Sequence, residues 1–336
     1  MPGMSALELI LPFGLPPPEL ASDLLRQLEM PAFARLMGRA ELHHRTLDPY
    51  AGLLPHQDYL LTRAGVTNLA AQTMQVLQVQ AGAGSWLLLH PCHFHIARDH
   101  LVLTDMRALS LEEVESRALF DAAQPCFSGQ DLQLAWGNAH VWFLRAEALA
   151  ALNTSAPDAA AGHNIDIWMP KGEGERAWRR LHNEVQMLWH DHPVNQEREA
   201  RGHKPVNALW CWNARSTGAQ PLSFESEALR AFLPRAPLPP QDGLNAAHAG
   251  GLHVLDCLAE PALAGDWGAW LQIMQQVERA WIAPALQHLV DGHVKQLRLV
   301  ISDGQRLLQA DCSRLALRKF WNKPSLAALA GTGRPA

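Results

Sequence analysis

The sequence predicts an α/β protein in which a core sheet is flanked by helices. Apolar side chains recur at helical spacing along residues 178–188 and again along 267–281, so each segment has one face that must pack on a core. Residues 7–11 and 297–301 are instead short runs rich in leucine, isoleucine and valine, which is typical of buried strands. The length of 336 residues is sufficient for two lobes of unequal size.

The first half of the chain contains several local signals. Pro31 suits the first position of a helix, and Gly137-Asn138 suits the tight turn of a hairpin. Residues 41–63 are polar and only weakly periodic, so no regular element is predicted there. The expected elements are strands 7–11, 85–89, 101–103, 132–136 and 140–144, and helices 19–28, 31–37, 69–79 and 112–120.

The stretch 175–213 has the strongest signals. Its first helix should end before Pro193, because proline lacks an amide hydrogen and disfavours helical geometry in the residue before it. Asn195 is expected to cap a second, short helix, which Gly202 closes. Apolar residues on both sides of segment 206–213 predict a strand that is covered on two faces and internal to its sheet.

The chain after residue 213 is again predicted to contain a loop, strands and a helix. Five prolines make residues 216–246 a loop-rich connection. Residues 252–255 are an expected strand, and the strand at 297–301 leads into Ser302-Asp303. The tryptophan-rich helix 267–281 is expected to pack on the core, with an assembly interface as the alternative. Residues 331–336 are predicted to be a frayed tail.

Composition limits the possible functions. A net charge of -5 and dispersed basic residues do not predict nucleic-acid binding. Five cysteines without a CxxC pair indicate reduced thiols. We find no signal-peptide pattern and no apolar run long enough to cross a bilayer. These observations predict a cytoplasmic protein that has no membrane partner, while its oligomeric state is left open.

One motif resembles a known family. His192-Pro193-Val194-Asn195, followed by Arg198, Gly202, Pro205 and Asn207, resembles the HPVNxxRxxxGxxPxN segment of archaeal-type cofactor-independent phosphoglycerate mutases. The whole chain also resembles a proteobacterial family that carries a phosphoglycerate-mutase-like label. The resemblance implies an alkaline-phosphatase-like core sheet and two-metal phosphotransfer from a serine nucleophile. It implies a discontinuous core, residues 1–65 and 201–330, and an inserted smaller α+β lobe, residues 66–200.

Several positions depart from the pattern of these mutases. The expected metal-binding aspartate after the first strand is replaced in Leu11-Pro12-Phe13-Gly14, and no serine occurs between Glu41 and Arg63. Their Asp-His pair corresponds here to Asp303-Gly304. We therefore expect a phosphoglycerate-mutase-like protein that is not competent as a two-metal phosphomutase and has a binding or regulatory role. The alternative is a metal-dependent phosphomutase or phosphatase that acts on a small phosphorylated acid through a rebuilt site.

A metal-dependent enzyme with a rebuilt site would need metal ligands, and the sequence contains a candidate single-metal site. His90, His93 and His95 are close in sequence, and the last two should share a face of an extended segment. Asp303 follows a predicted strand, where ligands collect in α/β folds. The competing interpretation of the histidines is a hydrogen-bonded network. We expect no cofactor, with manganese, magnesium or zinc as the alternative. Ser302 lacks a nucleophile elbow such as GxSxG, so a serine hydrolase is not predicted.

Besides the two-metal and single-metal sites, the sequence contains a candidate anion-binding pocket. Asn195, Arg198, Lys204 and Asn207 could together bind a small phosphorylated or carboxylate ligand, because helix amides and basic side chains bind such groups. The competing interpretation makes Asn195 a helix cap, Arg198 part of a solvated helix face and Asn207 a turn residue.

Overall fold

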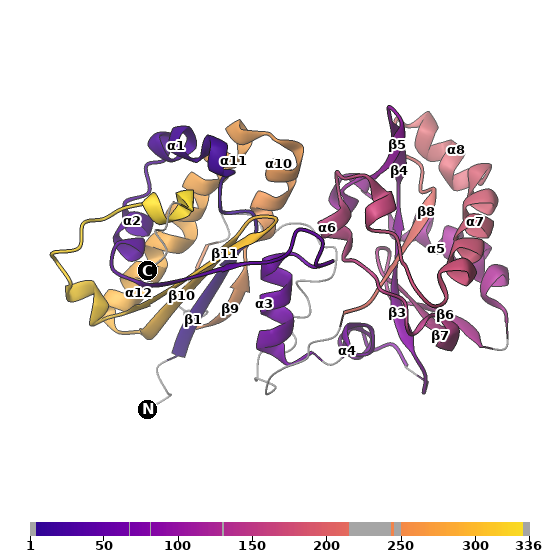
Figure 1. The fold of residues 1–336 in the computed structure, drawn as a ribbon, viewed down its shortest axis with the longest axis horizontal. Coiled ribbons are helices and arrows are strands. Elements are labelled where there is room, and N and C mark those ends of the chain that lie inside the picture. The colour runs from indigo at the N-terminus through magenta and orange to yellow at the C-terminus, as the bar shows by residue number, and fades with distance from the viewer. Residues whose placement is uncertain are drawn as a thin grey trace. The chain divides into compact units, whose positions relative to one another are not determined.

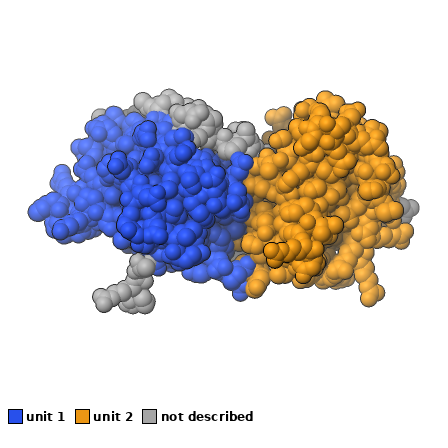
Figure 2. All heavy atoms as spheres, turned by 90° about the horizontal axis from the view of Figure 1, so that it is seen from above, with its two compact units in different colours: residues 1–49, 54–56, 236–336 blue, residues 50–53, 57–235 orange. Residues whose placement is uncertain are grey.

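The computed structural model describes residues 5–331, except residues 67, 81, 130, 215–242 and 245–249. Contacts divide the chain into two compact units, which Figure 2 distinguishes by colour: unit 1 comprises residues 1–49, 54–56 and 236–336, and unit 2 comprises residues 50–53 and 57–235. Almost all of the predicted loop 216–246, and residues 332–336 of the predicted tail, lie outside the described residues.

Unit 1 is built on a five-stranded mixed sheet (Figure 1). Its internal strand β1 (Ser5–Leu11) pairs in parallel with the central strand β10 (Val294–Ser302) and with the edge strand β9 (Gly251–Val254). On the other side of β10, antiparallel pairing adds β11 (Arg306–Ser313) and then β2 (Glu41–Thr46). The carboxyl ends of β1 and β10 therefore lie side by side, where α/β folds carry their sites.

Helices flank this sheet, and their apolar faces form the core of unit 1. The predicted stripe of 267–281 is confirmed: Trp270, Met274 and Val277 are fully buried within the unit. The helix changes to π geometry over its last part. The helical elements of unit 1 are α1 (Pro18–Gln27), α2 (Pro31–Met37), η7 (Asp256–Leu258), α10 (Ala259–Ala264), α11 (Trp267–Val277), the π-helix η8 (Glu278–Ile282), α12 (Ala283–Asp291), η9 (Ala316–Arg318) and η10 (Ala327–Ala330).

Unit 2 contains a four-stranded antiparallel sheet in the order β6-β7-β3-β8 and a separate hairpin, β4-β5 (Figure 1). The strands are β3 (Trp86–Cys92), β4 (Phe94–Ala97), β5 (His100–Leu103), β6 (Leu132–Trp136), β7 (Trp142–Ala146) and β8 (Ala208–Trp212). The helical elements are α4 (Leu69–Val76), η1 (Met106–Leu109), α5 (Glu113–Ala123), η2 (Gln124–Phe127), η3 (Glu147–Leu149), α6 (Pro157–Ala160), η4 (Ile165–Ile167), α7 (Glu175–His190) and α8 (Pro193–Ala200).

Aromatic side chains tie the sheet of unit 2 to α5 and α7. Trp142 on β7 meets Phe120 of α5 edge-on at 5.1 Å between ring centroids and Trp189 of α7 at 5.8 Å. The indole N–H of Trp189 donates to the Leu119 carbonyl. All these rings are buried, so the amphipathic helix expected near residue 175 packs on the core. Trp178 and Val185 are buried as its periodicity predicts, but Leu188, which was expected on the same face, is exposed and Trp189 is buried instead.

The mixed α/β class, with a central sheet flanked by helices, is confirmed, but several local expectations were wrong. Strand β2 and helix α3 (Pro55–Ala64) occupy the stretch where no element was predicted. Strand β2 is an edge strand with mostly exposed residues, so it lacks the alternation that reveals a strand. Strand β8 has the two covered faces expected of it but lies at the edge of its sheet.

The expected division of the chain at residue 200 also differs from the structure. Because β8 pairs with β3, the described residues that follow α8, up to residue 214, belong to unit 2. Most of α3 does so as well, although the core was expected to extend to residue 65. Among the described residues, no helix is both long and apolar enough to cross a bilayer.

Candidate functional site

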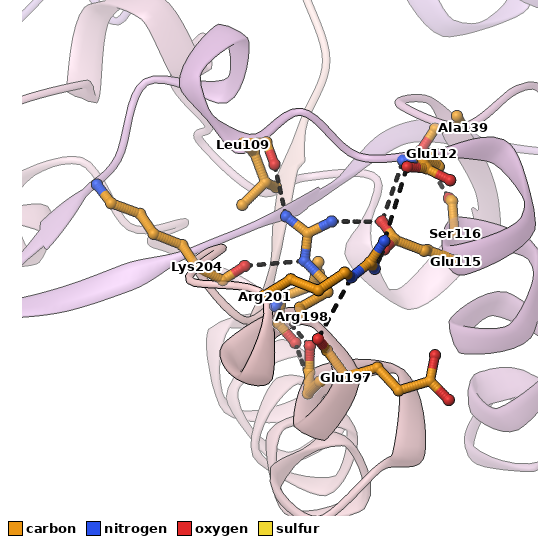
Figure 3. Close-up of polar contacts among 11 residues, drawn as sticks. Leu109, Glu112, Glu115, Ser116, Ala139, Glu197, Arg198, Arg201 and Lys204 are labelled. Carbon is orange, nitrogen blue, oxygen red and sulfur yellow. Dashed lines mark hydrogen bonds and ion pairs between the residues drawn. The ribbon is translucent and has the colours of Figure 1, made fainter.

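Arg198 of α8 lies at the centre of a buried polar cluster (Figure 3). Its side chain is fully buried, and its Nε donates to the Lys204 carbonyl at 2.9 Å. Its two Nη groups donate to the Leu109 carbonyl and to the Glu115 carboxylate. The arginine therefore joins α8 to α5 and to the last residue of η1. The expected solvated or ligand-facing position of Arg198 was wrong.

The carboxylate of Glu115 is the counter-ion of the Arg198 guanidinium. Burial opposes its ionisation, yet a hydrogen bond from the Glu112 amide and the positive charges and donors of Arg198 and Arg201 hold its pKa below the usual value. Three groups thus stabilise one carboxylate. This is an ion pair buried inside unit 2, and it leaves neither charged group available to a ligand.

Asn195 and Asn207 act as side-chain clamps. The Nδ2 of Asn195 donates to the carbonyls of Trp189 and Val206, and its Oδ1 accepts from the Val206 amide. Asn207 exchanges hydrogen bonds with both backbone groups of Phe94. The predicted capping role of Asn195 was wrong, because the Nδ1 of His192 accepts from the Val194 amide and forms the cap of α8.

His90 uses both of its ring nitrogens. Its Nδ1 lies 2.9 Å from the His140 carbonyl oxygen, and its Nε2 accepts from the Trp212 indole at 2.8 Å. A carbonyl only accepts, so Nδ1 carries the proton of the neutral ring. Burial lowers the pKa of His90 to about 4, against the smaller opposing effect of the His140 hydrogen bond. A ring held in this way has no free nitrogen with which to bind a metal.

His93 and His95 do lie together, as expected. Their rings are stacked, 6.3 Å apart at 10°. The Nδ1 of His93 lies 2.8 Å from the Pro205 carbonyl oxygen, and the Nδ1 of His95 lies 3.2 Å from the Thr104 hydroxyl. Lys204 reaches the same hydroxyl at 3.4 Å. Burial lowers the pKa of His93, and the positive charge of Lys204 adds to this. Two imidazoles and an ammonium group form a polar cluster but not a complete set of metal ligands.

Asp303 organises the turn between β10 and β11. Its Oδ1 accepts from the amides of Gln305 and Arg306, and its Oδ2 accepts from the Arg306 guanidinium at 2.6 Å. Arg306 continues to the Pro16 carbonyl. No group of three or more histidine, cysteine, aspartate or glutamate side chains is placed to hold an ion within the described part of the chain. The donor set there does not fit the metal pair that the family resemblance implies.

Two further features were not assigned from sequence. Ser302, the last residue of β10, places its hydroxyl 3.1 Å from Nδ1 of His56, and both side chains are buried. In unit 2, a cavity of about 530 Å³ is lined partly by Tyr50, Trp168 and Lys171. The rings of Tyr50 and Trp168 lie 6.2 Å apart. Neither feature could be recognised in the sequence, because its residues come from distant segments.

Comparison with curated proteins shows weak sequence homology to cofactor-independent phosphoglycerate mutases. A probable 2,3-bisphosphoglycerate-independent phosphoglycerate mutase of Geobacter sulfurreducens is 28% identical over 117 residues, which are 34% of this chain and 29% of the relative. The corresponding enzyme of Methanosarcina mazei is 24% identical over 119 residues, 35% of this chain and 30% of the relative. Each match thus spans less than a third of the relative. No protein-family model matches the chain.

Two solved structures are similar over most of the chain. The PH0037 protein of Pyrococcus horikoshii has a TM-score of 0.51 at 13% identity, covering 92% of this chain and 87% of that one. A cofactor-independent phosphoglycerate mutase of Thermoplasma acidophilum has a TM-score of 0.45 at 15% identity, covering 99% and 96%. The first similarity shows a shared fold, and at this identity it shows only the fold.

Proposed function

We propose that this protein is a non-catalytic relative of the cofactor-independent phosphoglycerate mutases and works by binding a small phosphorylated or carboxylic acid. The observation that carries the proposal is the position of Asp303, whose two carboxylate oxygens are directed to Arg306 and to two amides. A metal pair needs several carboxylates or imidazoles with lone pairs directed at the ions. Asp303 could act as a metal ligand only if the β10-β11 turn were rearranged.

The end of β1 supports the same conclusion. The segment Leu11-Pro12-Phe13-Gly14 stands where the mutases' motif leads us to expect a metal-binding aspartate, and its Phe13 has a positive φ of 58°, which non-glycine residues rarely adopt. Its carbonyl accepts from the Trp270 indole at 2.8 Å. This segment has therefore been rebuilt as a packing contact of unit 1, and it contributes no ligand.

The cavity of unit 2 is the binding site that we propose. Its volume of about 530 Å³ falls in the range of small-molecule pockets. Tyr50, Ile167 and Trp168 give it an apolar wall, and Lys171 is the charged residue among the described residues of its lining. An ammonium group beside an aromatic wall favours a ligand that has a carboxylate or phosphate and a compact apolar part.

The thiols fit a reducing compartment, and we infer that the protein acts in the cytoplasm. All five cysteines are free, and burial raises the pKa of each. Thiols of this kind are mostly protonated at neutral pH and react slowly.

The catalytic part of the proposal is tested by incubating the purified full chain with 3-phosphoglycerate, 2-phosphoglycerate and p-nitrophenyl phosphate. Each assay is repeated with manganese, magnesium and zinc. We expect no turnover above that of the Asp303→Ala variant. Metal-dependent turnover that this variant loses would overturn the non-catalytic assignment.

The binding part is tested by calorimetry with the same phosphorylated acids. We expect Lys171→Ala to weaken binding by about tenfold or more, because a charge-assisted contact is lost. Lys204→Ala is the matched control, since it removes a lysine from the other polar cluster of unit 2. Equal losses in both variants, or a loss in Lys204→Ala alone, would contradict the assignment of the cavity.

The buried pair of Ser302 and His56 favours a second candidate, a phosphoesterase with a rebuilt site. The pair lies at the carboxyl end of β10, and an imidazole next to a hydroxyl can act as its base. Esterase or phosphatase turnover that Ser302→Ala abolishes, in a variant whose melting temperature is unchanged, would establish this candidate. Turnover that persists in Ser302→Ala would exclude it.

A further inference from the structure

The segment that follows β11 exposes large apolar side chains. Leu315 is 70% exposed, Phe320 83% and Trp321 67%. Single exposed apolar residues are common, but three within seven residues form a patch that calls for an explanation. Figure 1 shows this C-terminal segment, in yellow, standing out from unit 1 beyond α12 and β10. We call residues 314–323 the C-terminal surface.

This exposure does not come from a loosely attached chain. Leu317 is buried, and the Ala316 amide donates to the Ser313 hydroxyl, so the start of the segment is attached to β11. Beyond the surface, the Ser325 amide donates to the Ala34 carbonyl of α2. Phe320 and Trp321 meet edge-on, with centroids 5.2 Å apart. The apolar side chains are therefore presented to solvent by a segment that is fastened on both sides.

Positive charge surrounds the apolar residues. Arg314, Arg318, Lys319 and Lys323 are all exposed in this segment, and none forms an ion pair with a described carboxylate. Residues 312–336 contain no aspartate or glutamate. The overall charge of -5 thus conceals a local basic region.

Arg35 and Arg39 add to this region from the side of α2. The pKa of Cys312 is raised to about 11 by burial, and the opposing effects come from Arg39, Lys319 and Arg35. These three cations therefore lie around the same thiol at the end of β11. The positive field extends beyond the exposed segment itself.

We propose that the C-terminal surface docks on a membrane that contains anionic phospholipids. Cations attract the lipid phosphates, while a tryptophan and other apolar side chains enter the interface between headgroups and acyl chains. The docking is peripheral and reversible, because the surface inserts side chains and not a helix. The inference departs from the sequence-based expectation of no membrane partner, which rested on the lack of a signal-peptide pattern and of an apolar run long enough to cross a bilayer.

Two other partners fit less well. Single-stranded nucleic acid binds to aromatic rings that present their faces along a groove, whereas Phe320 and Trp321 pack against each other at 78° and Leu315 cannot stack on a base. A second copy of the chain related by a two-fold axis would bring the same cations together, and like charges repel. The surface lies in unit 1, so the inference does not depend on the ligand proposed for unit 2.

The test is co-sedimentation of the full chain with vesicles of phosphatidylcholine alone and with vesicles that also contain phosphatidylglycerol. We expect binding to the anionic vesicles that is stronger by about tenfold or more and that weakens as salt is raised. The variant Lys319→Glu/Lys323→Glu should lose this binding. The variant Phe320→Ser/Trp321→Ser should weaken it at all salt concentrations, because it removes the apolar part.

Matched controls use exposed residues elsewhere. Met187→Ser removes an apolar side chain that is 80% exposed on α7, and Arg180→Glu reverses an exposed charge there. Both should bind like the unaltered protein. Equal binding to neutral and anionic vesicles, or binding that is unchanged in the variants of the C-terminal surface, would overturn the proposal. Tighter binding to single-stranded DNA than to vesicles, or self-association lost in the same variants, would also overturn it.

Discussion

The indole N–H of Trp212 donates to Nε2 of His90 across 2.8 Å inside unit 2. The contact joins neighbouring strands β8 and β3, and His90 donates in turn to the His140 carbonyl. His90, one of the three histidines that the sequence offered as metal ligands, is thus a neutral, fully bonded residue of the sheet. Its protonation would break the Trp212 contact.

This arrangement predicts a loss of stability in acid. Because the pKa of His90 falls from 6.5 in the unfolded chain to about 4 in the fold, the unfolded chain binds more protons between these values. The contribution of His90 is complete above pH 6.5 and is lost as the pH falls to about 4. It amounts to about 3 kcal/mol. Urea unfolding over this range should give a shallower pH dependence for His90→Gln, whereas parallel curves would contradict the prediction.

Arg198→Ala should destabilise the protein by about 3–5 kcal/mol, since it leaves Glu115 with a weaker partner and two carbonyls without a donor. Arg180→Ala is the matched control, because that arginine pairs with Glu184 on an exposed face of α7. An exposed pair contributes about 1 kcal/mol at most. The free energy of unfolding in urea measures both. Similar losses in the two variants would show that the Arg198 cluster is not structural.

Asn195→Asp should be destabilising by about 3 kcal/mol or more at neutral pH, because a carboxylate would face the Trp189 and Val206 carbonyls that the amide now donates to. Part of the loss should be recovered in acid, when the new carboxyl is protonated. Gln196→Glu makes the same chemical change at the next, exposed position and should have little effect. Thermal melts at several pH values compare the two. A neutral Asn195→Asp variant would argue against the clamp.

Asp303→Asn should lower stability by about 1–3 kcal/mol, because it replaces the charged acceptor of the Arg306 guanidinium. Since this loss comes from the turn and not from a metal, EDTA should leave the melting temperature of the unaltered protein unchanged. A melting temperature that EDTA lowers in the unaltered protein, but not in Asp303→Asn, would instead place a metal at Asp303.

The candidate site was harder to predict than the fold. The sequence brought Asn195, Arg198, Lys204 and Asn207 together as donors to a ligand, but all four donate to the protein itself. Lys204 does so through its ammonium group, which reaches the Thr104 hydroxyl beside His95. The same side-chain donors can bind a carbonyl of the protein or the phosphate of a ligand, so residue type does not distinguish a structural role from a binding role. Only the direction of each side chain distinguishes them.

The amino-acid sequence by itself determined the elements whose burial follows a local pattern. Apolar side chains recur at helical spacing in α7 and α11 and form short continuous runs in β1 and β10, so each leaves a local record. The tertiary structure alone decided the pairing of β8 with β3, the presence of β2 at an exposed edge and the partners of Arg198, His90 and Asp303. These features depend on contacts between residues far apart in the chain, and no local pattern records them.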